Sequence, residues 1–180
     1  MTPLYEKDTV TLLTAHPSSL NEFKLALQDS FSVAAIVEFG HPLDEPIPSD
    51  DDVAQSLSAP GSVVHWIMAN GERVGGAVVS VDEESRRNTL SFFFVSTKRQ
   101  SRGLGVRAWK TIEEAYPSTR VWETVTPYFE KRNIHFYVNK CGFKIVEFYN
   151  KSNPDPHQKA RAHPNVDDSD EMFRFEKNME

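Results

Sequence analysis

The chain has 180 residues, of which 39% are hydrophobic, and its net charge of −6 argues against nucleic acid as the main partner. No apolar run approaches the roughly 18 residues of a membrane span, and the first residues lack the basic and apolar segments of a secretory signal. Because the single cysteine, Cys141, also excludes an internal disulfide, we expect one cytoplasmic domain over residues 1–180 with no membrane partner.

The first third of the chain predicts one strand and two helices. Alternating residues favour a strand over Thr9–Leu13, and apolar residues at helical spacing favour a helix over Pro17–Phe31. Three prolines make residues 42–48 irregular, and Ser49 is a good N-cap for the short helix that follows.

The middle of the chain predicts an antiparallel hairpin and a third strand. Asn70-Gly71 is a strong turn signal between two candidate strands, Ser62–Met68 and Arg73–Val81. A polar turn then leads into an apolar strand over Thr89–Val95. These segments are typical of hairpins, not of alternating strands and helices.

The last part predicts two helices and three strands. A helix begins near Val106, a strand covers Arg120–Val125, and Pro127 opens a helix that runs to about Cys141. Phe143–Phe148 and Met172–Phe175 form the final strand pair. The expected fold class is mixed α/β (α+β), with a largely antiparallel sheet, one parallel pair and helices on both faces.

A basic glycine loop, Gln100–Gly105, lies between the third strand and the helix that follows it. Backbone N–H groups and the dipole at a helix N-terminus favour an anion, and glycine lets the backbone approach a phosphate closely. Lys98, Arg99, Arg102 and Arg107 surround the loop. The segment therefore predicts a site for a polyphosphate.

Spacing distinguishes the known phosphate-binding motifs. A P-loop does not match. Gly103–Ala108 matches the Rossmann pattern, and Glu123 follows Gly103 at the distance expected of a ribose ligand. However, Ser96–Arg102 separates the strand from Gly103, whereas a Rossmann glycine follows its strand almost at once. A Rossmann-type dinucleotide-binding oxidoreductase stays as an alternative.

A second motif supports another identification. Gln100, Gly103 and Gly105 fit the pattern [QR]-x-x-G-x-[GA], and Arg132–Phe143 resembles a helix that carries a tyrosine and ends in Gly-Phe. In both features the chain resembles the coenzyme A-binding GNAT acetyltransferases, roughly from Ser62 to Lys177. One departure is Glu130, where many members of that family carry asparagine.

The resemblance implies a GNAT-like sheet with a V-shaped splay between the two central parallel strands, and acetyl-CoA as cosubstrate with no metal. It implies direct acetyl transfer to a small-molecule amine or peptide amine, and leaves a homodimer open. A non-catalytic acyl-CoA-binding regulatory domain is a further alternative. The residues that would bind the cosubstrate are Phe94, Val95, Gln100, Ser101, Arg102, Gly103, Leu104, Gly105 and Val106.

Three side chains are candidates for the chemistry. Tyr137, six residues before Phe143, matches the acid tyrosine that protonates the leaving thiolate in the family. Glu123, on the strand that should border the cleft, is the candidate base, directly or through a water. Glu38 lies in an apolar segment and could bind a cationic amine. The scattered histidines lack the spacing of a metal site.

Overall fold

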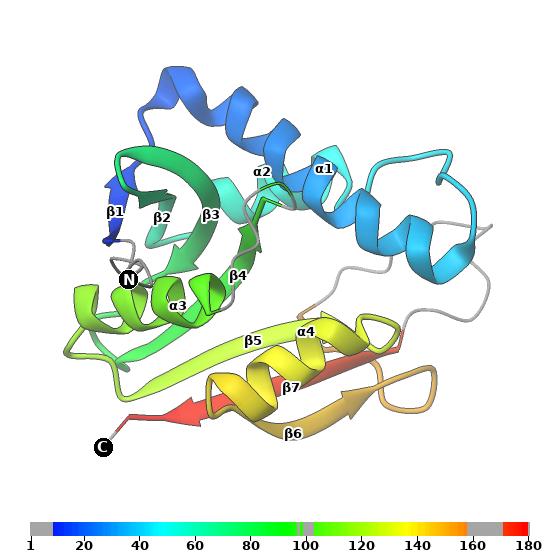
Figure 1. The fold of residues 1–180 in the computed structure, drawn as a ribbon. Coiled ribbons are helices and arrows are strands. Elements are labelled where there is room, and N and C mark those ends of the chain that lie inside the picture. The colour runs from blue at the N-terminus through cyan, green and yellow to red at the C-terminus, as the bar shows by residue number, and fades with distance from the viewer. Residues whose placement is uncertain (1–8, 97, 99–102, 158–170, 180) are drawn as a thin grey trace, which may run out of the picture. The chain divides into compact units, whose positions relative to one another are not determined.

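The computed structural model describes residues 9–96, 98, 103–157 and 171–179 (Figure 1). The chain divides into two compact units. Unit 1 comprises Met1–Ser80 and Phe92–Pro117, and unit 2 comprises Val81–Ser91 and Ser118–Glu180. Within the described ranges, no helix combines the length and apolar character needed to cross a membrane.

Seven strands form one hydrogen-bonded sheet in the order β1-β2-β3-β4-β5-β7-β6. Strand β4 (Arg87–Val95) begins in unit 2 and ends in unit 1. Its first residues, Arg87–Leu90, pair in parallel with Val121–Thr124 of β5, whereas β1–β2, β2–β3, β5–β7 and β6–β7 are antiparallel. The predicted mixed, largely antiparallel sheet is confirmed, and it differs from the parallel sheet that the Rossmann alternative requires.

Unit 1 begins with three antiparallel strands: β1 (Val10–Thr14), β2 (Ser62–Ala69) and β3 (Glu72–Ser80). Asn70 and Gly71 both have positive φ, of 52° and 82°, as a two-residue hairpin turn between right-twisted strands requires. The predicted hairpin is therefore confirmed.

The helices of unit 1 are η1 (Pro17–Ser19), α1 (Leu20–Phe39), α2 (Asp50–Ser58) and α3 (Leu104–Ala115). Helix α1 continues well past the predicted end at Phe31 and stops at Gly40, which has a left-handed φ of 75°. Ser49 caps α2 through a capping box with Asp52, as predicted.

Helices pack on both faces of the sheet in unit 1 (Figure 1). One apolar cluster joins α1 and α2 to the sheet through Phe23, Leu27, Val53, Val64, Trp66, Val78 and Phe94. The other joins α3 to the sheet through Ile67, Ala69, Val74, Leu104 and Ala108. Alternating side chains of β4 supply both clusters, because successive residues of a strand point to opposite faces.

Unit 2 contains β5 (Val121–Pro127), α4 (Lys131–His135), the π-helical turn η3 (Phe136–Lys140), β6 (Lys144–Tyr149) and β7 (Met172–Asn178). The prediction that Pro127 opens a helix is wrong. Pro127 is the last residue of β5 and pairs with Met172 of β7. It therefore belongs to the strand, and the helix begins only at Lys131.

Candidate functional site

The start of α3 presents backbone N–H groups, which the sequence of the glycine loop predicts for the N-terminus of this helix. Gly103 is the N-cap and has a left-handed φ of 86°. The N–H of Arg107 donates to the carbonyl of Gly103 at 3.0 Å and is the first intrahelical bond. The N–H groups of Leu104, Gly105 and Val106 therefore have no acceptor within the helix. Such a helix start can bind an anion.

Apolar packing holds this helix start in place. Leu104 is 2% exposed and Ala108 is fully buried, and both pack against Ile67, Ala69 and Val74 of β2 and β3. Because these residues anchor the first two turns to the sheet, the N–H groups have a fixed direction before any ligand binds. Preorganised donors of this kind lose little entropy on binding.

Positive charge lies beside the helix start. A Cβ built on Gly103 would lie 3.9 Å from a terminal guanidinium nitrogen of Arg107, so this side chain folds back toward the N-cap. Lys98 is exposed. The predicted contacts Gln100, Ser101 and Arg102 lie outside the described residues.

At the end of β4, Phe94 can contact a ligand only through its backbone. Phe94 is 6% exposed, and its ring packs edge-on against Phe23 with centroids 5.5 Å apart. The N–H of Ser96 donates to the carbonyl of Val74 in β3 at 2.7 Å. Because the Phe94 side chain is in the core, the predicted role of Phe94 and Val95 falls on their peptide groups.

Tyr137 is a buried residue of unit 2. It is 5% exposed and packs against Phe143 and Phe175, with ring centroids 5.5 and 5.7 Å away. Its hydroxyl is hydrogen-bonded to the side chain of Thr124, and the Thr124 hydroxyl donates to the carbonyl of Leu90 at 2.9 Å. Burial raises the pKa of Tyr137 well above its ordinary value. The phenol therefore keeps its proton at neutral pH.

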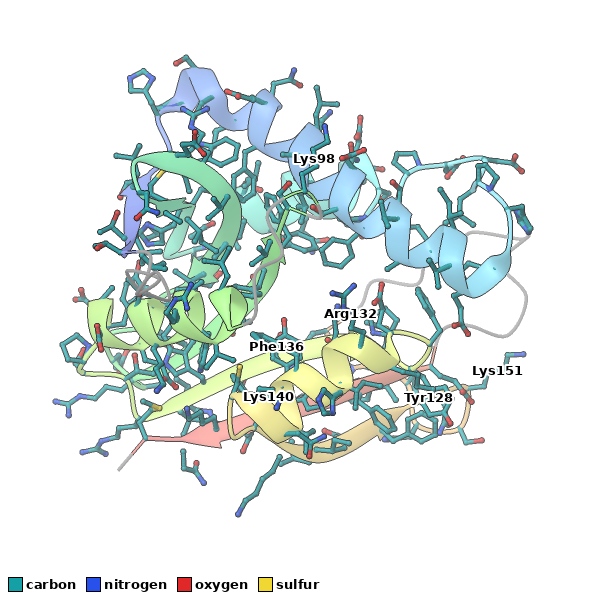
Figure 2. The ribbon with its side chains drawn as sticks, in the orientation of Figure 1. Lys98, Tyr128, Arg132, Phe136, Lys140 and Lys151 are labelled. Atoms are coloured by element: carbon teal, nitrogen blue, oxygen red, sulfur yellow. The ribbon has the colours of Figure 1, made fainter. Side chains whose placement is uncertain are left out.

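A π-helical turn sets the direction of this tyrosine. The N–H of Cys141 donates to the carbonyl of Phe136, five residues earlier, at 3.0 Å. A π turn adds one residue to a helix and rotates what precedes it. Tyr137 consequently faces the sheet, while Arg132, Phe136 and Lys140 lie along the helix at four-residue intervals (Figure 2).

Glu123 belongs to a network of charged side chains on β4, β5 and β7. Its carboxylate accepts hydrogen bonds from the Arg87 Nε at 3.1 Å and from the Arg174 guanidinium at 3.4 Å. The hydrogen bond to Glu123 is the main cause of a raised pKa of Arg87. Both arginines also contact Glu176 at 2.6 Å. We call these four residues the charge network.

Strand alternation separates Glu123 from the tyrosine. Glu123 and Thr124 are consecutive in β5, so their side chains point to opposite faces. Thr124 contacts Tyr137, whereas Glu123 contacts the two arginines. The structure therefore does not bring the candidate base and the candidate acid together on one face of unit 2.

Glu38 lies on the surface of α1. It occupies the last turn of the helix and is exposed, next to Val37, which is 80% exposed. The apolar neighbourhood that the sequence indicates is thus a solvent-facing one. The role of Glu38 in binding an amine stays a prediction.

Glu130 is a buried carboxylate that sequence reasoning did not assign to the site. It is 6% exposed and forms the N-cap of α4, where its carbonyl accepts from the N–H of Ile134 at 3.0 Å. Burial raises the pKa of Tyr137, and the charge of Glu130 adds to that shift. The sequence marks this position only as a departure from asparagine, and nothing in its neighbours predicts burial.

Metal ligands do not gather in the described parts of the chain. Among residues 9–96, 98, 103–157 and 171–179, no group of three or more histidine, cysteine, aspartate or glutamate side chains could hold a metal ion. The donor groups at the α3 start are backbone N–H groups, which bind anions and not cations.

Comparison with known proteins gives a family match and a close relative. Residues 26–143 match the model of the Acetyltransferase (GNAT) family. The protein YrkN of Bacillus subtilis (strain 168), described as uncharacterized, is 53% identical over 174 residues, which cover 94% of each chain.

Solved structures share the fold at low sequence identity. A Bacillus subtilis acetyltransferase in complex with CoA has a TM-score of 0.65 and 18% identity, covering 95% of this chain and 99% of its own. The ribosomal-protein-S18-alanine N-acetyltransferase of Escherichia coli has a TM-score of 0.65, 13% identity and 94% coverage of both chains. A GNAT family acetyltransferase of Elizabethkingia anophelis with acetyl-CoA bound has a TM-score of 0.62 and 18% identity, covering 96% of this chain and 100% of its own.

Proposed function

Because the chain belongs to the GNAT acetyltransferase family, we propose that it transfers the acetyl group of acetyl-CoA to a primary amine by direct attack. The observation that carries the proposal is the start of α3, where N–H groups follow the left-handed Gly103. This geometry fits the diphosphate of acetyl-CoA, because glycine lets the backbone come close and the helix dipole favours the negative charge.

Two backbone segments of unit 1 would hold the donor. The N–H groups of Leu104, Gly105 and Val106 would bind the diphosphate, with the Arg107 guanidinium beside them. The peptide groups of Phe94 and Val95 would pair with the pantetheine arm as an added strand does. Side-chain burial supports this division, since Phe94 offers a ligand only its backbone.

The chemistry requires a neutral amine and a proton for the departing sulfur. An alkylamine has a pKa near 10, so it must lose a proton before its nitrogen attacks the thioester carbonyl. The N–C bond forms, the C–S bond breaks, and a backbone N–H polarises the carbonyl oxygen. Tyr137 is the proposed donor of the proton that the sulfur takes. Burial raises its pKa, which keeps the phenol protonated at neutral pH but makes it a weaker acid than an exposed tyrosine.

The amine must also give up its proton to an acceptor. Glu123 is the candidate acceptor, either directly or through a water. Its carboxylate already accepts hydrogen bonds from Arg87 and Arg174. With a water-mediated path, the Glu123 carboxylate would keep its hydrogen bonds in the charge network while a water contacts the amine.

The acceptor class is a small-molecule amine or a peptide amine. One structural neighbour is by its name an acetyltransferase of ribosomal protein S18 alanine, and at 13% identity this likeness extends to the fold alone. Glu38 is proposed to attract a cationic acceptor, since an exposed carboxylate can steer a positive charge. We also propose that the protein acts in the cytoplasm, alone or as a homodimer.

Ligand binding and thiol release test the function. Acetyl-CoA and CoA should raise the melting temperature, because a ligand that binds only the folded state stabilises it. NAD and ATP should leave it unchanged. A panel of amines should then release free CoA only when the correct acceptor is present. A shift with NAD and none with CoA would overturn the proposal.

A further inference from the structure

Gly75 of β3 lies against the backbone at the end of β4. A Cβ built on Gly75 would stand 2.2 Å from the carbonyl oxygen of Phe94, 3.1 Å from its carbonyl carbon and 3.0 Å from the Cα of Val95. The oxygen is nearer than the carbon, so this carbonyl points at Gly75. No side chain could occupy that position unless the β4 backbone moved.

The direction of this carbonyl fixes the direction of the next N–H. A trans peptide is planar, so its C=O and N–H point in opposite directions. The N–H of Val95 therefore points away from β3, toward the opposite edge of β4. The following N–H, of Ser96, points back and donates to Val74 at 2.7 Å, which keeps the alternation of a strand.

We infer that Gly75 is a positioning residue for the donor. Its missing side chain lets the Phe94 carbonyl come close to β3, and this turns the Val95 N–H outward to meet the pantetheine arm. The inference rests on the proposed function, because it assumes that acetyl-CoA contacts the end of β4. Gly75 itself touches no part of the ligand and acts only through the β4 backbone.

Gly76 provides a matched control one residue further along the same strand. A Cβ there would meet the rings of Phe23 at 2.3 Å and Phe94 at 2.7 Å, and its contacts are side chains instead of the β4 backbone. Gly75 and Gly76 point to opposite faces of β3. A methyl at either position should destabilise unit 1, but only a methyl at Gly75 should displace the Phe94–Val95 peptide.

The test compares Gly75→Ala with Gly76→Ala for two ligands, by calorimetric titration. The ligands are CoA and adenosine 3′-phosphate 5′-diphosphate, which keeps the phosphates and lacks the pantetheine arm. Gly75→Ala should lower the affinity for CoA about tenfold, which corresponds to the loss of roughly one hydrogen bond. Its affinity for the nucleotide should be unchanged. Gly76→Ala should lower the melting temperature and leave the ratio of the two affinities as in the unaltered protein.

The outcomes separate this inference from the function on which it rests. Unchanged CoA binding by Gly75→Ala, or an equal loss for both ligands, would overturn the positioning role. Failure of the unaltered protein to bind either ligand would overturn the proposed function instead. If Gly75→Ala does not fold, hydrogen exchange of the Val95 amide decides. CoA should slow that exchange in the unaltered protein, and an unchanged rate at saturating CoA would contradict the inference.

Discussion

The start of α3 and the surroundings of Tyr137 are built in different ways. At the α3 start the groups proposed to bind the donor are peptide N–H groups, and glycine, helix geometry and an apolar anchor fix their direction. Around Tyr137 the groups proposed to take part in the chemistry are side chains on a helix and on β5. Their direction depends on a π turn and on which face of the strand each residue occupies. A backbone site is therefore specified locally, whereas a side-chain site is specified by packing.

This difference leads to different responses to mutation. A backbone site is lost when the chain cannot adopt its φ angle or cannot approach the ligand, whatever the new side chain is. A side-chain site is lost when one polar atom is removed, even if the packing survives. The variants below compare the two regions, in order of decreasing expected effect.

Tyr137→Phe should lower kcat about 100- to 10,000-fold, the usual contribution of general acid catalysis, and leave the dissociation constant of acetyl-CoA nearly unchanged. The ring keeps its packing against Phe143 and Phe175, so the fold should survive. Steady-state kinetics with a good acceptor and calorimetric titration of the donor measure the two quantities.

Thr124→Val is the matched control for that variant. It removes the partner of the Tyr137 hydroxyl and keeps the proposed proton donor. Tyr137→Phe removes one buried hydrogen bond and should cost about 1 kcal/mol of folding stability, whereas Thr124→Val removes two, those to Tyr137 and to the Leu90 carbonyl, and should cost about 2 kcal/mol. Only Tyr137→Phe should lose most of its turnover. Equal kcat values in the two variants would show that Tyr137 is a packing residue.

Gly103→Ala should weaken CoA at least about tenfold, because a strained N-cap displaces charge-assisted hydrogen bonds of roughly 1.5–3 kcal/mol each. Gly40→Ala is its control. Gly40 ends α1 with φ 75°, close to the 86° of Gly103, and a Cβ there would meet nothing within 4 Å. Both variants should lose about 1–2 kcal/mol of stability from a left-handed alanine. Equal CoA affinity in both would remove the α3 start from the donor site.

Glu123→Gln should have a smaller effect on turnover than Tyr137→Phe. Glu123 is a member of the charge network and lies on the face of β5 opposite to the one that Tyr137 contacts. If Glu123 accepts the proton, the lost rate should recover as pH rises, since more of the amine is then already neutral. A loss that is independent of pH would indicate a structural role. The folding stability should fall by no more than about 1 kcal/mol, as for a partly exposed ion pair.

Acid should weaken unit 1 through His65, with the smallest effect of the series. The His65 Nε2 lies 2.5 Å from the Tyr116 hydroxyl, and burial lowers the pKa of His65 below its ordinary 6.5. The unfolded chain therefore takes up the proton first. The contribution of neutral His65 to folding stability is fully present above pH 6.5. It is lost as the pH falls toward the lower pKa of the folded state.

Urea unfolding at a series of pH values measures that slope. One proton can contribute at most about 1.4 kcal/mol per pH unit. His65→Gln should flatten this part of the profile, because glutamine does not titrate. An identical profile in the variant would assign the acid sensitivity to other groups.

The sequence predicts the elements whose signals are local. The hairpin at Asn70-Gly71 and the cap at Ser49 are confirmed, because each is specified by a few neighbouring residues. Helix α1 is longer than predicted, since Phe31 is only the last residue of a clear apolar repeat and no stop signal follows until Gly40. Pro127 resembles a helix start by itself, and only its pairing with β7, distant in sequence, shows that it ends a strand.

The candidate site follows the same division. The role of glycine at the α3 start can be predicted from the sequence, because a positive φ, here 86° at Gly103, is a preference of the single residue. The face occupied by Glu123 and the burial of Glu130 depend on strand phase and on packing by distant segments. The position of Gly75 against Phe94 is likewise a contact between two strands that no local pattern encodes.

The π turn at Phe136–Lys140 has a consequence for how relatives are aligned. In an uninterrupted α-helix, the inward position that Tyr137 occupies would fall five residues before the phenylalanine of the Gly-Phe pair, whereas here it falls six before Phe143. For any relative that lacks the π turn and carries its tyrosine five residues before that phenylalanine, a gap-free alignment anchored on Gly142-Phe143 would match the tyrosine to Val138. Homologues should be superimposed in space across this helix, with a one-residue gap, before any catalytic tyrosine is transferred between them.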